Sequence, residues 1–207
     1  MILPGAAMWD ERYGGAGYAY GLEANAFLAE QTSERVNGLK AIVPGDGEGR
    51  NGVWLSGQGY AVDSLDLSEH GVAKSLALAK ARGVEVNAFR ADALAWDWPR
   101  AHYDLVALIY LHLAPPQRRR LHALALASLK PGGRLVLEAF RPQQIERQKA
   151  GARGGPRDVT LLCSVDDLTR DFTGAEILRL GEFDAELREG ALHFGQGAVV
   201  RALVRAR

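Results

Sequence analysis

The sequence predicts an α/β fold in which a doubly wound, mostly parallel sheet of seven strands ends in an antiparallel C-terminal hairpin. Short apolar segments alternate with segments of helical periodicity along most of the 207 residues, as in βαβ units that place helices on both faces of a parallel sheet. Residues 103–110 form a near-continuous apolar run, typical of a central strand buried on both faces. Two long β-prone segments joined at Glu189-Gly190 indicate the terminal hairpin.

Each expected strand is a short apolar or alternating segment bounded by turn-forming residues. The first five are predicted at residues 39–43, 60–66, 84–89, 103–110 and 134–140, and the hairpin strands at 175–188 and 191–205. In open sheets of this kind, ligands bind at the carboxyl ends of the strands. Functional residues are therefore expected just after these segments and at the tip of the hairpin.

Helices are predicted in the intervals between the strands. Val53 opens a short helical patch after the first strand. Ser68 stands at an N-cap position of the next helix, and Gly83 stands where a left-handed glycine ends it. Pro115 opens the helix after the fourth strand, because proline is tolerated in a first turn. Residues 165–172 form the last short helix.

The composition argues against several classes of protein. The 25 basic and 25 acidic residues give zero net charge, which disfavours nucleic acid or an anionic membrane as a partner. No apolar run approaches the roughly 18 residues of a membrane span, and the first residues lack the pattern of a signal peptide. The single cysteine, Cys163, cannot form an internal disulfide and is expected to be a buried small hydrophobe. We expect a cytoplasmic protein without a metal site; no pattern indicates the oligomeric state.

A glycine-rich loop, residues 45–52, follows the first strand. Gly45, Gly47 and Gly49 allow a sharp turn from strand to helix and leave no Cβ where a ligand must approach the backbone. A dinucleotide fingerprint would place its third glycine at position 50, where this chain has Arg50. The pattern is therefore Gly-x-Gly-x-Gly, which disfavours a nicotinamide dinucleotide.

Two carboxylates follow the next two strands. Asp66 ends the second strand, where a carboxylate can accept hydrogen bonds from both hydroxyls of a ribose. Asp92-Ala93 follows the third strand, where a carboxylate can accept from the amino group of an adenine. Together with the glycines, these residues describe an adenosyl ligand that lacks an obligatory pyrophosphate.

On these residues, and on Tyr103-Asp104-Leu105-Val106 and Leu129-Lys130-Pro131-Gly132-Gly133, the chain from Leu39 to Arg205 resembles the class I S-adenosylmethionine-dependent methyltransferases. The resemblance implies a Rossmann-like fold, S-adenosyl-L-methionine as methyl donor, S-adenosyl-L-homocysteine as product and a small-molecule methyl acceptor. The cofactor-binding residues that it implies are Gly45, Asp46, Gly47, Gly49, Arg50, Asn51, Asp66, Leu67, Asp92, Ala93, Ile109 and Tyr20.

The chain departs from the class at one position. The class usually has an acidic residue two positions before the first glycine of the loop, and this chain has Val43 there. Asp46 or Glu48 is the alternative partner for the ammonium of the methionine moiety. The resemblance leaves open how that end of the cofactor is held.

Shorter motifs resemble a small bacterial group that includes the tellurite-resistance and thiol methyltransferases. They are Trp9-Asp10-Glu11-Arg12-Tyr13, Tyr20-Gly21, Asn25-Ala26-Phe27-Leu28, Gly47-Glu48-Gly49-Arg50-Asn51, and Glu189-Gly190 with His193 and Gly195. This resemblance implies a soft nucleophile as acceptor, either a thiol or a chalcogen oxyanion. An O- or N-methyltransferase of a small metabolite remains open, as do an NAD(P)-dependent oxidoreductase and a non-catalytic adenosyl-binding protein.

Two histidines are catalytic candidates. His112 follows the fourth strand and is expected either to act as a base or substrate hydrogen-bonding group or to tie down the strand-to-helix loop. His193 lies just past the hairpin turn, which falls at the active-site edge if the sixth strand runs parallel to the rest. The resemblance places this segment on the substrate side.

Two further residues complete the catalytic candidates. Arg141 follows the fifth strand and either steers an anionic substrate or is an exposed arginine. Tyr13 belongs to a segment rich in glycine and aromatic residues, which either folds over the cofactor as a lid or packs beneath the first helix. The run Arg118-Arg119-Arg120 is expected to be a solvated helix face.

The expected organisation is a single methyltransferase domain over residues 1–207. Within it we expect an N-terminal lid and helix at 1–35, a cofactor-binding core at 39–140, a mobile glycine-rich loop at 141–160 and a C-terminal helix and hairpin at 161–207.

Overall fold

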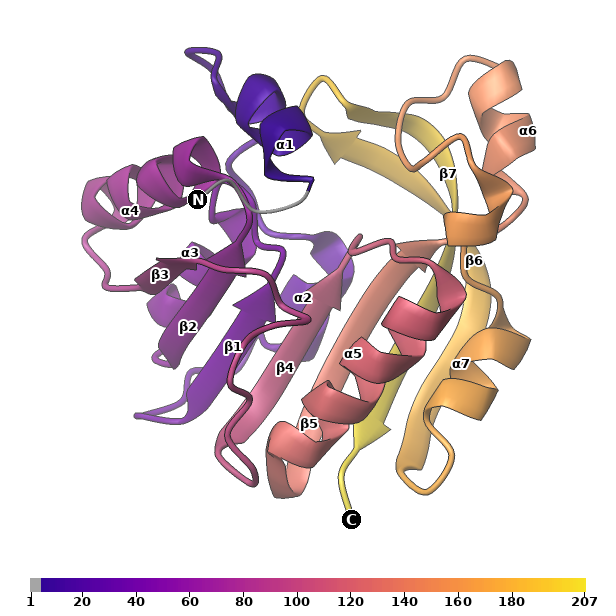
Figure 1. The fold of residues 1–207 in the computed structure, drawn as a ribbon. Helices are drawn as coiled ribbons and strands as arrows, with labels where there is room; N and C mark the ends of the chain where they lie inside the picture. The colour runs from indigo at the N-terminus through magenta and orange to yellow at the C-terminus, as the bar shows by residue number, and fades with distance from the viewer. Residues whose placement is uncertain (1–4) are drawn as a thin grey trace.

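The computed structural model describes residues 5–207, which form a single seven-stranded sheet with helices on both faces (Figure 1). The strand order is β3-β2-β1-β4-β5-β7-β6. All strands are parallel except β7, which runs antiparallel to both β5 and β6. The predicted doubly wound, mostly parallel sheet with its C-terminal antiparallel hairpin is therefore confirmed.

The strand bounds follow the sequence pattern closely. The strands are β1 Lys40–Pro44, β2 Ala61–Asp66, β3 Asn87–Arg90, β4 Tyr103–Ile109, β5 Leu129–Phe140, β6 Glu176–Glu189 and β7 His193–Arg205. The central strand β4 is buried along nearly its whole length, because it has neighbours on both edges and helices on both faces. In register, Ile42 of β1 pairs with Asp63 of β2 on one side and with Val106 of β4 on the other.

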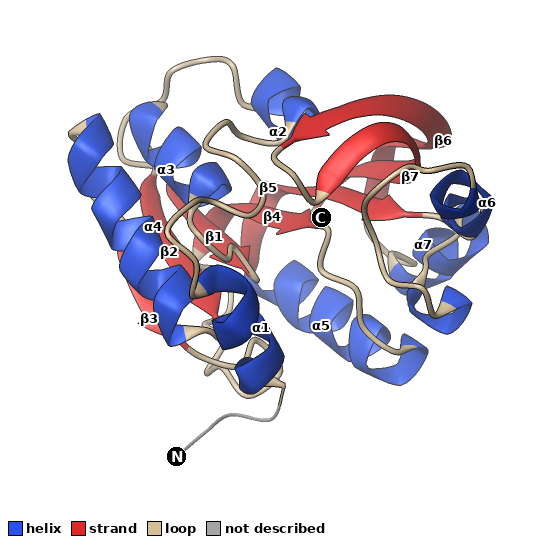
Figure 2. Cartoon of the chain, turned by 90° about the horizontal axis from the view of Figure 1, so that it is seen from above, coloured by secondary structure: helices blue, strands red, loops and turns tan. Residues whose placement is uncertain are grey.

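The helices divide between the two faces of the sheet. They are α1 Ala6–Tyr13, α2 Ala26–Gln31, α3 Arg50–Gly57, α4 Glu69–Arg82, α5 Pro115–Ser128, α6 Gln144–Lys149 and α7 Val165–Asp171, with a 3₁₀ turn, η1, at Val159–Leu161. One face is covered by α2, α3 and α4 and the other by α5 and α7 (Figure 1). Seen from above the ends of the parallel strands, α1 lies toward β3 and α6 toward the β6–β7 hairpin (Figure 2).

Two layers of apolar side chains hold the helices to the sheet. On the first face, Phe27 of α2 and Leu55 of α3 are buried against the strands. On the second, Leu121 of α5 and Phe172 beside α7 are buried in the same way. Burying each such side chain contributes roughly 1.5–3 kcal/mol relative to leaving it exposed, so the sheet is fixed from both sides and its carboxyl edge is left free for a site.

The predicted helix signals hold at α4. The Ser68 side chain accepts a hydrogen bond from the Gly71 backbone N–H, and Gly83 ends the helix with a φ of 66°. The helix after β1 begins at Arg50 rather than near Val53, because the Gly49 turn leads directly into it. No helix within residues 5–207 is long and apolar enough to cross a bilayer.

The segment expected to be a mobile loop, residues 141–160, was predicted wrongly in part. It contains α6 and η1. The Gln144 side chain is fully buried and bridges two segments, since its Oε1 accepts from the Ala198 N–H and its Nε2 donates to the Gly154 carbonyl. The sequence pattern did not reveal this helix because a buried glutamine, and not an apolar stripe, anchors it.

Candidate active site

The glycine-rich loop turns the chain sharply between β1 and α3. Gly47 and Gly49 have φ angles of 61° and 90°, a region that side-chain-bearing residues rarely adopt. A Cβ on Gly49 would lie 2.2 Å from Ser75 Oγ, and one on Gly47 would lie 2.6 Å from the Tyr13 hydroxyl. Ser75 of α4 and Tyr13 at the end of α1 therefore lie against the loop backbone, and only glycine fits at positions 47 and 49.

Asp66 fixes the loop against the end of β2. One carboxylate oxygen accepts from the Gly47 N–H at 2.8 Å and the other from the Ser68 N–H at 2.8 Å. The side chain is buried, and this burial raises the pKa of Asp66. The carboxylate is thus held in a defined position, and it lines a cavity at the carboxyl edge of the sheet.

A cavity of about 810 Å³ opens at the carboxyl edge of the sheet, a size within the range of about 300–1,000 Å³ found for small-molecule sites. Its wall includes ten of the twelve predicted cofactor-binding residues: Gly45, Asp46, Arg50, Asn51, Asp66, Leu67, Asp92, Ala93, Ile109 and Tyr20. The other two, Gly47 and Gly49, shape the loop behind the wall. Glycines without Cβ atoms and the carboxylates of Asp66 and Asp92 meet in one half of this cavity and fit an adenosyl group.

The two alternatives for the cofactor ammonium, Asp46 and Glu48, both have other partners. Asp46 accepts from Ser64 Oγ at 2.9 Å and from the Gly52 N–H at 3.1 Å, and burial raises its pKa to about 6. Glu48 accepts from Lys74 Nζ at 2.8 Å and from the Ala19 N–H at 2.7 Å. These bonds tie the loop to α3 and to the N-terminal segment.

The other half of the cavity is aromatic. The rings of Tyr20, Tyr110 and Phe140 surround His193, with ring centroids 4.5, 4.6 and 5.3 Å from the imidazole. Tyr110 follows β4 with a φ of 53°, and its hydroxyl donates to the buried Glu138 carboxylate. Tyr110 and Phe140 were not predicted as site residues, because in the sequence each resembles an ordinary apolar residue at the end of a buried strand.

His193 is oriented by an ion pair. Its Nδ1 lies 3.1 Å from Glu189 Oε2, and that same oxygen lies 2.9 Å from Nη2 of Arg50. A carboxylate only accepts, so Nδ1 carries the proton and donates it, and Nε2 keeps a lone pair. No other residue among 5–207 hydrogen-bonds this ring. Burial lowers the pKa of His193, so the imidazole is neutral at pH 7.

Glu189 stays ionised in this arrangement. Burial alone would raise the pKa of Glu189, but the hydrogen bond from His193 and the charge of Arg50 lower it to about 2. The sequence marked Glu189 as part of the hairpin turn and of a group motif, and Arg50 as a cofactor-binding residue of the loop, but it did not indicate a contact between them. The contact between them joins the cofactor loop to the hairpin.

His112 is not a free base. Its Nδ1 lies 2.9 Å from the Tyr110 carbonyl oxygen and its Nε2 lies 3.0 Å from the Phe140 backbone nitrogen. The Phe140 N–H requires an acceptor at Nε2, so Nδ1 is the protonated nitrogen and both ring positions are used. Burial lowers the pKa of His112 to about 4. The expectation of a catalytic base is corrected: His112 ties down the strand-to-helix loop.

Arg141 does not face the cavity. Its guanidinium pairs with Glu182 at 3.1 Å and with Asp184 at 3.0 Å, both on β6. The hypothesis that Arg141 steers a substrate is therefore wrong, because the side chain leaves β5 toward the neighbouring hairpin. Tyr13 does line the cavity, stacked on Trp9 and packed over Gly47. Burial raises the pKa of Tyr13, so its hydroxyl stays protonated and cannot serve as a base.

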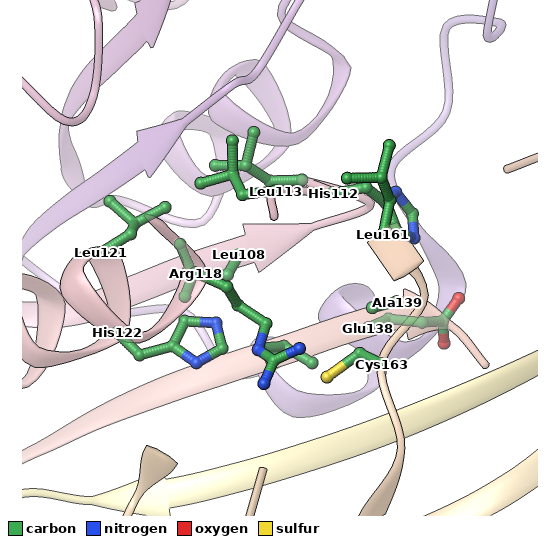
Figure 3. Close-up of a pocket in the computed structure, with 12 residues that line it drawn as sticks. Leu108, His112, Leu113, Arg118, Leu121, His122, Glu138, Ala139, Leu161 and Cys163 are labelled. Atoms are coloured by element: carbon green, nitrogen blue, oxygen red, sulfur yellow. The ribbon is translucent and has the colours of Figure 1, made fainter. Parts of the chain in front are cut away.

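A second cavity, of about 10 Å³, lies behind the first between α5 and the ends of β4 and β5 (Figure 3). The Arg118 guanidinium lies between the His122 ring and the Cys163 sulfur and pairs with Asp171 at 2.8 Å. Arg118 is buried, so it does not belong to the solvated face predicted for the arginine run. Cys163 is buried as predicted, and burial raises the pKa of its thiol to about 12. This space holds about one water.

No group of histidine, cysteine and acidic residues within the described range could hold a metal ion.

Residues 44–133 match the family described as "Methyltransferase domain". No curated protein matches the chain in sequence.

Several solved structures share the fold. One, from a study of the conversion of a disulfide bond into a thioacetal group during echinomycin biosynthesis, is 21% identical with a TM-score of 0.74, over 97% of this chain and 92% of that chain. TehB from Haemophilus influenzae is 16% identical with a TM-score of 0.69, over 98% and 67%. The N-methyltransferase NodS from Bradyrhizobium japonicum, in complex with S-adenosyl-L-homocysteine, is 14% identical with a TM-score of 0.69, over 97% of each chain.

The matched domain contains the glycine-rich loop, Asp66 and Asp92, and the sheet has the same fold as these structures, among them the N-methyltransferase NodS. The chain thus contains a methyltransferase domain on the fold of the class I S-adenosylmethionine-dependent methyltransferases, and the domain and the fold identify S-adenosyl-L-methionine as its cofactor.

Proposed function

We propose that this enzyme methylates the sulfur of a small thiol and that His193 accepts the thiol proton. The observation that carries the proposal is that His193 lines the cavity as a neutral imidazole whose Nδ1 is held by Glu189 and whose Nε2 has no hydrogen-bond partner within residues 5–207. A thiol has an ordinary pKa of about 8.5 and is mostly protonated at pH 7, so its methylation needs a base. A chalcogen oxyanion needs none, so a positioned base favours the thiol over the oxyanion.

The residues of the glycine loop and the two carboxylates would hold the cofactor. Asp66 would accept from the ribose hydroxyls and Asp92 from the adenine amino group. S-adenosyl-L-methionine supplies a methyl group on a cationic sulfur and leaves as S-adenosyl-L-homocysteine when the acceptor sulfur displaces that sulfur from the methyl carbon. The loop and the aromatic cluster would align the acceptor with this methyl group, which is the main requirement of an in-line displacement.

His193 accepts the proton that the thiol loses. The S–H bond breaks as Nε2 takes the proton, and the sulfur keeps the electron pair with which it bonds to the methyl carbon. The imidazolium formed in this step lies against the ionised Glu189, which stabilises its charge. Phe140 and Tyr110 keep water from the sulfur, which strengthens this interaction.

The N-terminal residues would close the cofactor half of the cavity. Asp10 of α1 accepts from Ser68 Oγ at 2.6 Å and from the Glu69 N–H at 2.9 Å, and Arg12 donates to the Tyr20 hydroxyl at 2.8 Å. Of the N-terminal lid and helix expected at 1–35, the described residues from 5 up to α2 would then be the lid and α2 the helix, on a single domain whose cofactor-binding core is 39–140. These surface bonds are weak enough individually to break for product release.

The acceptor class is tested with purified protein and methyl-labelled cofactor. The panel contains small thiols, selenite, tellurite and halides, with a phenol and a primary amine for the O- and N-methyltransferase alternatives. Thiols are expected to be methylated fastest. If no thiol on the panel is methylated, the proposal is wrong.

The role of His193 is tested with His193→Asn. At pH 7 the variant is expected to lose about 10²–10³ in kcat/KM with a thiol. Above the thiol pKa the thiolate forms without a base, so the deficit should shrink at pH 9–10. His70→Asn replaces an exposed histidine on α4 and should behave as wild type. A deficit that stays constant with pH would contradict a base role, and retained activity with tellurite alone would favour the oxyanion alternative.

A further inference from the structure

One wall of the large cavity is the loop of residues 150–158, between α6 and η1. Two of its arginines, Arg153 and Arg157, line the cavity and are exposed. Within residues 5–207, neither has a carboxylate at ion-pair distance. The only side-chain hydrogen bond of Arg153 is a long one of 3.5 Å to the Ala191 carbonyl. Two positive charges are therefore available on this wall.

The loop is fixed next to the proposed base. The Arg153 N–H donates to the Phe194 carbonyl at 2.8 Å, and the Phe194 N–H donates back to the Arg153 carbonyl at 3.0 Å. Phe194 directly follows His193 in β7. A Cβ on Gly154 would lie 3.2 Å from a carbon of the His193 ring and 2.7 Å from the Phe140 ring. The loop backbone thus lies flat against the aromatic cluster.

The carbonyl groups of the loop are already bonded. The Gly154 carbonyl accepts from Gln144 Nε2 at 3.0 Å and from Gln148 Nε2 at 2.8 Å. No peptide bond in the described chain is cis, and the N–H and C=O of a trans peptide point in opposite directions. The Gly155 N–H therefore points away from these glutamines, and it has no hydrogen-bond acceptor within residues 5–207.

The carboxylates that line the cavity all lie in its cofactor half. The four are those of Asp46, Glu48, Asp66 and Asp92, from the glycine loop, the end of β2 and the segment after β3; the arginines that line this half are two, Arg12 and Arg50, so its carboxylates are in excess. The loop wall beside His193 contributes Arg153 and Arg157 to the lining and no carboxylate, and the Glu189 carboxylate that holds His193 does not line the cavity and is paired with Arg50. A cationic cofactor suits the first half, and an anionic group suits the second.

We infer that Arg153, Arg157 and the Gly155 N–H form a binding subsite for a carboxylate carried by the methyl acceptor. The acceptor is then a small thiol acid, whose sulfur reaches His193 while its carboxylate lies against the loop. A guanidinium matches a carboxylate with two parallel hydrogen bonds, so the subsite fixes orientation as well as charge. The identity of the reacting atom rests on the proposed function; the carboxylate subsite does not.

Turnover is measured with 3-mercaptopropionate and with 3-mercaptopropionamide, which differ in charge and not in length. The wild type is expected to have a KM at least tenfold lower for the carboxylate. Arg153→Gln combined with Arg157→Gln should remove most of this ratio, and Arg153→Lys with Arg157→Lys should retain part of it. Arg119→Gln, at an exposed position on α5, is the matched control. Equal KM values in the wild type, or a ratio that survives in the double glutamine variant, would overturn the subsite.

A binding measurement separates this inference from the proposed function. The enzyme loaded with S-adenosyl-L-homocysteine is titrated calorimetrically with 3-(methylthio)propionate and with its amide, which requires no turnover. Tighter binding of the acid, lost in the double glutamine variant and weakened by salt, supports the subsite even if no thiol is methylated. Equal binding of acid and amide refutes it, whatever the acceptor panel shows. Equal melting temperatures of all variants exclude misfolding as the cause.

Discussion

Arg50 and Glu189 form a buried ion pair of 2.9 Å across 139 residues of sequence. Arg50 begins the helix after the glycine loop, and Glu189 ends strand β6. The pair joins the cofactor half of the cavity to the half that contains His193. Since a buried pair is expensive to desolvate, it contributes little net stability. The pair instead fixes the position of the Glu189 carboxylate, to which the His193 imidazole donates its hydrogen bond.

Glu189→Gln is predicted to weaken the base. The Glu189 charge and hydrogen bond raise the pKa of His193 against the effect of burial, so their loss lowers that pKa further. The low-pH limb of kcat should move to lower pH, and the plateau of kcat should fall by about tenfold or more, because a weaker base accepts the proton less readily. A pH–rate profile with a good thiol acceptor measures both.

The affinity for S-adenosyl-L-homocysteine checks that Glu189→Gln leaves the cofactor half intact. It should change little, because the amide oxygen still accepts from Arg50. A limb that moves to higher pH would show that Glu189 does not act through His193.

The local parts of this site were predictable from sequence, and the contacts between distant segments were not. The glycines of the loop, the Ser68 cap and Asp66 follow from short-range patterns, because a turn or a cap is decided by neighbouring residues. His112 is a residue whose role could not be predicted from its neighbours in the sequence. Its function depends on the Phe140 N–H, which lies 28 residues away and satisfies the ring nitrogen that a base would need.

The direction of a side chain was the second thing that the sequence did not determine. Arg141 follows β5 directly, but its guanidinium points to the two carboxylates of β6 that it pairs with. His193 was identified as a candidate by its place in the hairpin. That it is held by Glu189, and through it by Arg50, depends on the packing of the hairpin over the glycine loop.

Gly49→Ala is predicted to destabilise the fold by about 3 kcal/mol or more, because the left-handed backbone adds to a steric overlap with Ser75. Gly83→Ala is the matched control: its φ is also positive, but its added Cβ meets nothing within 4 Å. It should cost only about 1 kcal/mol. Urea denaturation of both variants gives the difference.

Ser75→Gly separates the overlap from the backbone strain. In the Gly49→Ala background it removes the atoms that the new Cβ would meet, so the two changes should couple by about 1 kcal/mol or more in a double-mutant cycle. Strict additivity would show that the close approach to α4 is not what requires a glycine at position 49.

Asp66→Asn is predicted to weaken binding of S-adenosyl-L-homocysteine by about 10–100-fold, since one amide group replaces an acceptor oxygen and a charge-assisted hydrogen bond is lost. Asp63→Asn alters the same strand at a residue that bonds Tyr103 and Asn87 and does not line the cavity. Its affinity for the product should match that of the wild type. Titration calorimetry measures both, and equal losses in the two variants would mean that the effect comes from the strand and not from the site.

Asp46→Asn is predicted to change how stability depends on pH. The folded pKa of Asp46 is raised from 3.8 to about 6 by burial. A raised folded pKa stabilises the protein fully below the unfolded value, and this stabilisation is lost as pH rises through the folded value. The free energy of unfolding of the wild type should therefore fall relative to that of Asp46→Asn by about 3 kcal/mol between pH 3.8 and pH 7, at 1.36 kcal/mol per unit. The asparagine keeps an acceptor for the Gly52 N–H, so the variant should fold. Urea titrations of both proteins at intervals across this range measure the difference, and a gap that does not change with pH would show that the Asp46 carboxyl titrates alike in the folded and unfolded chains.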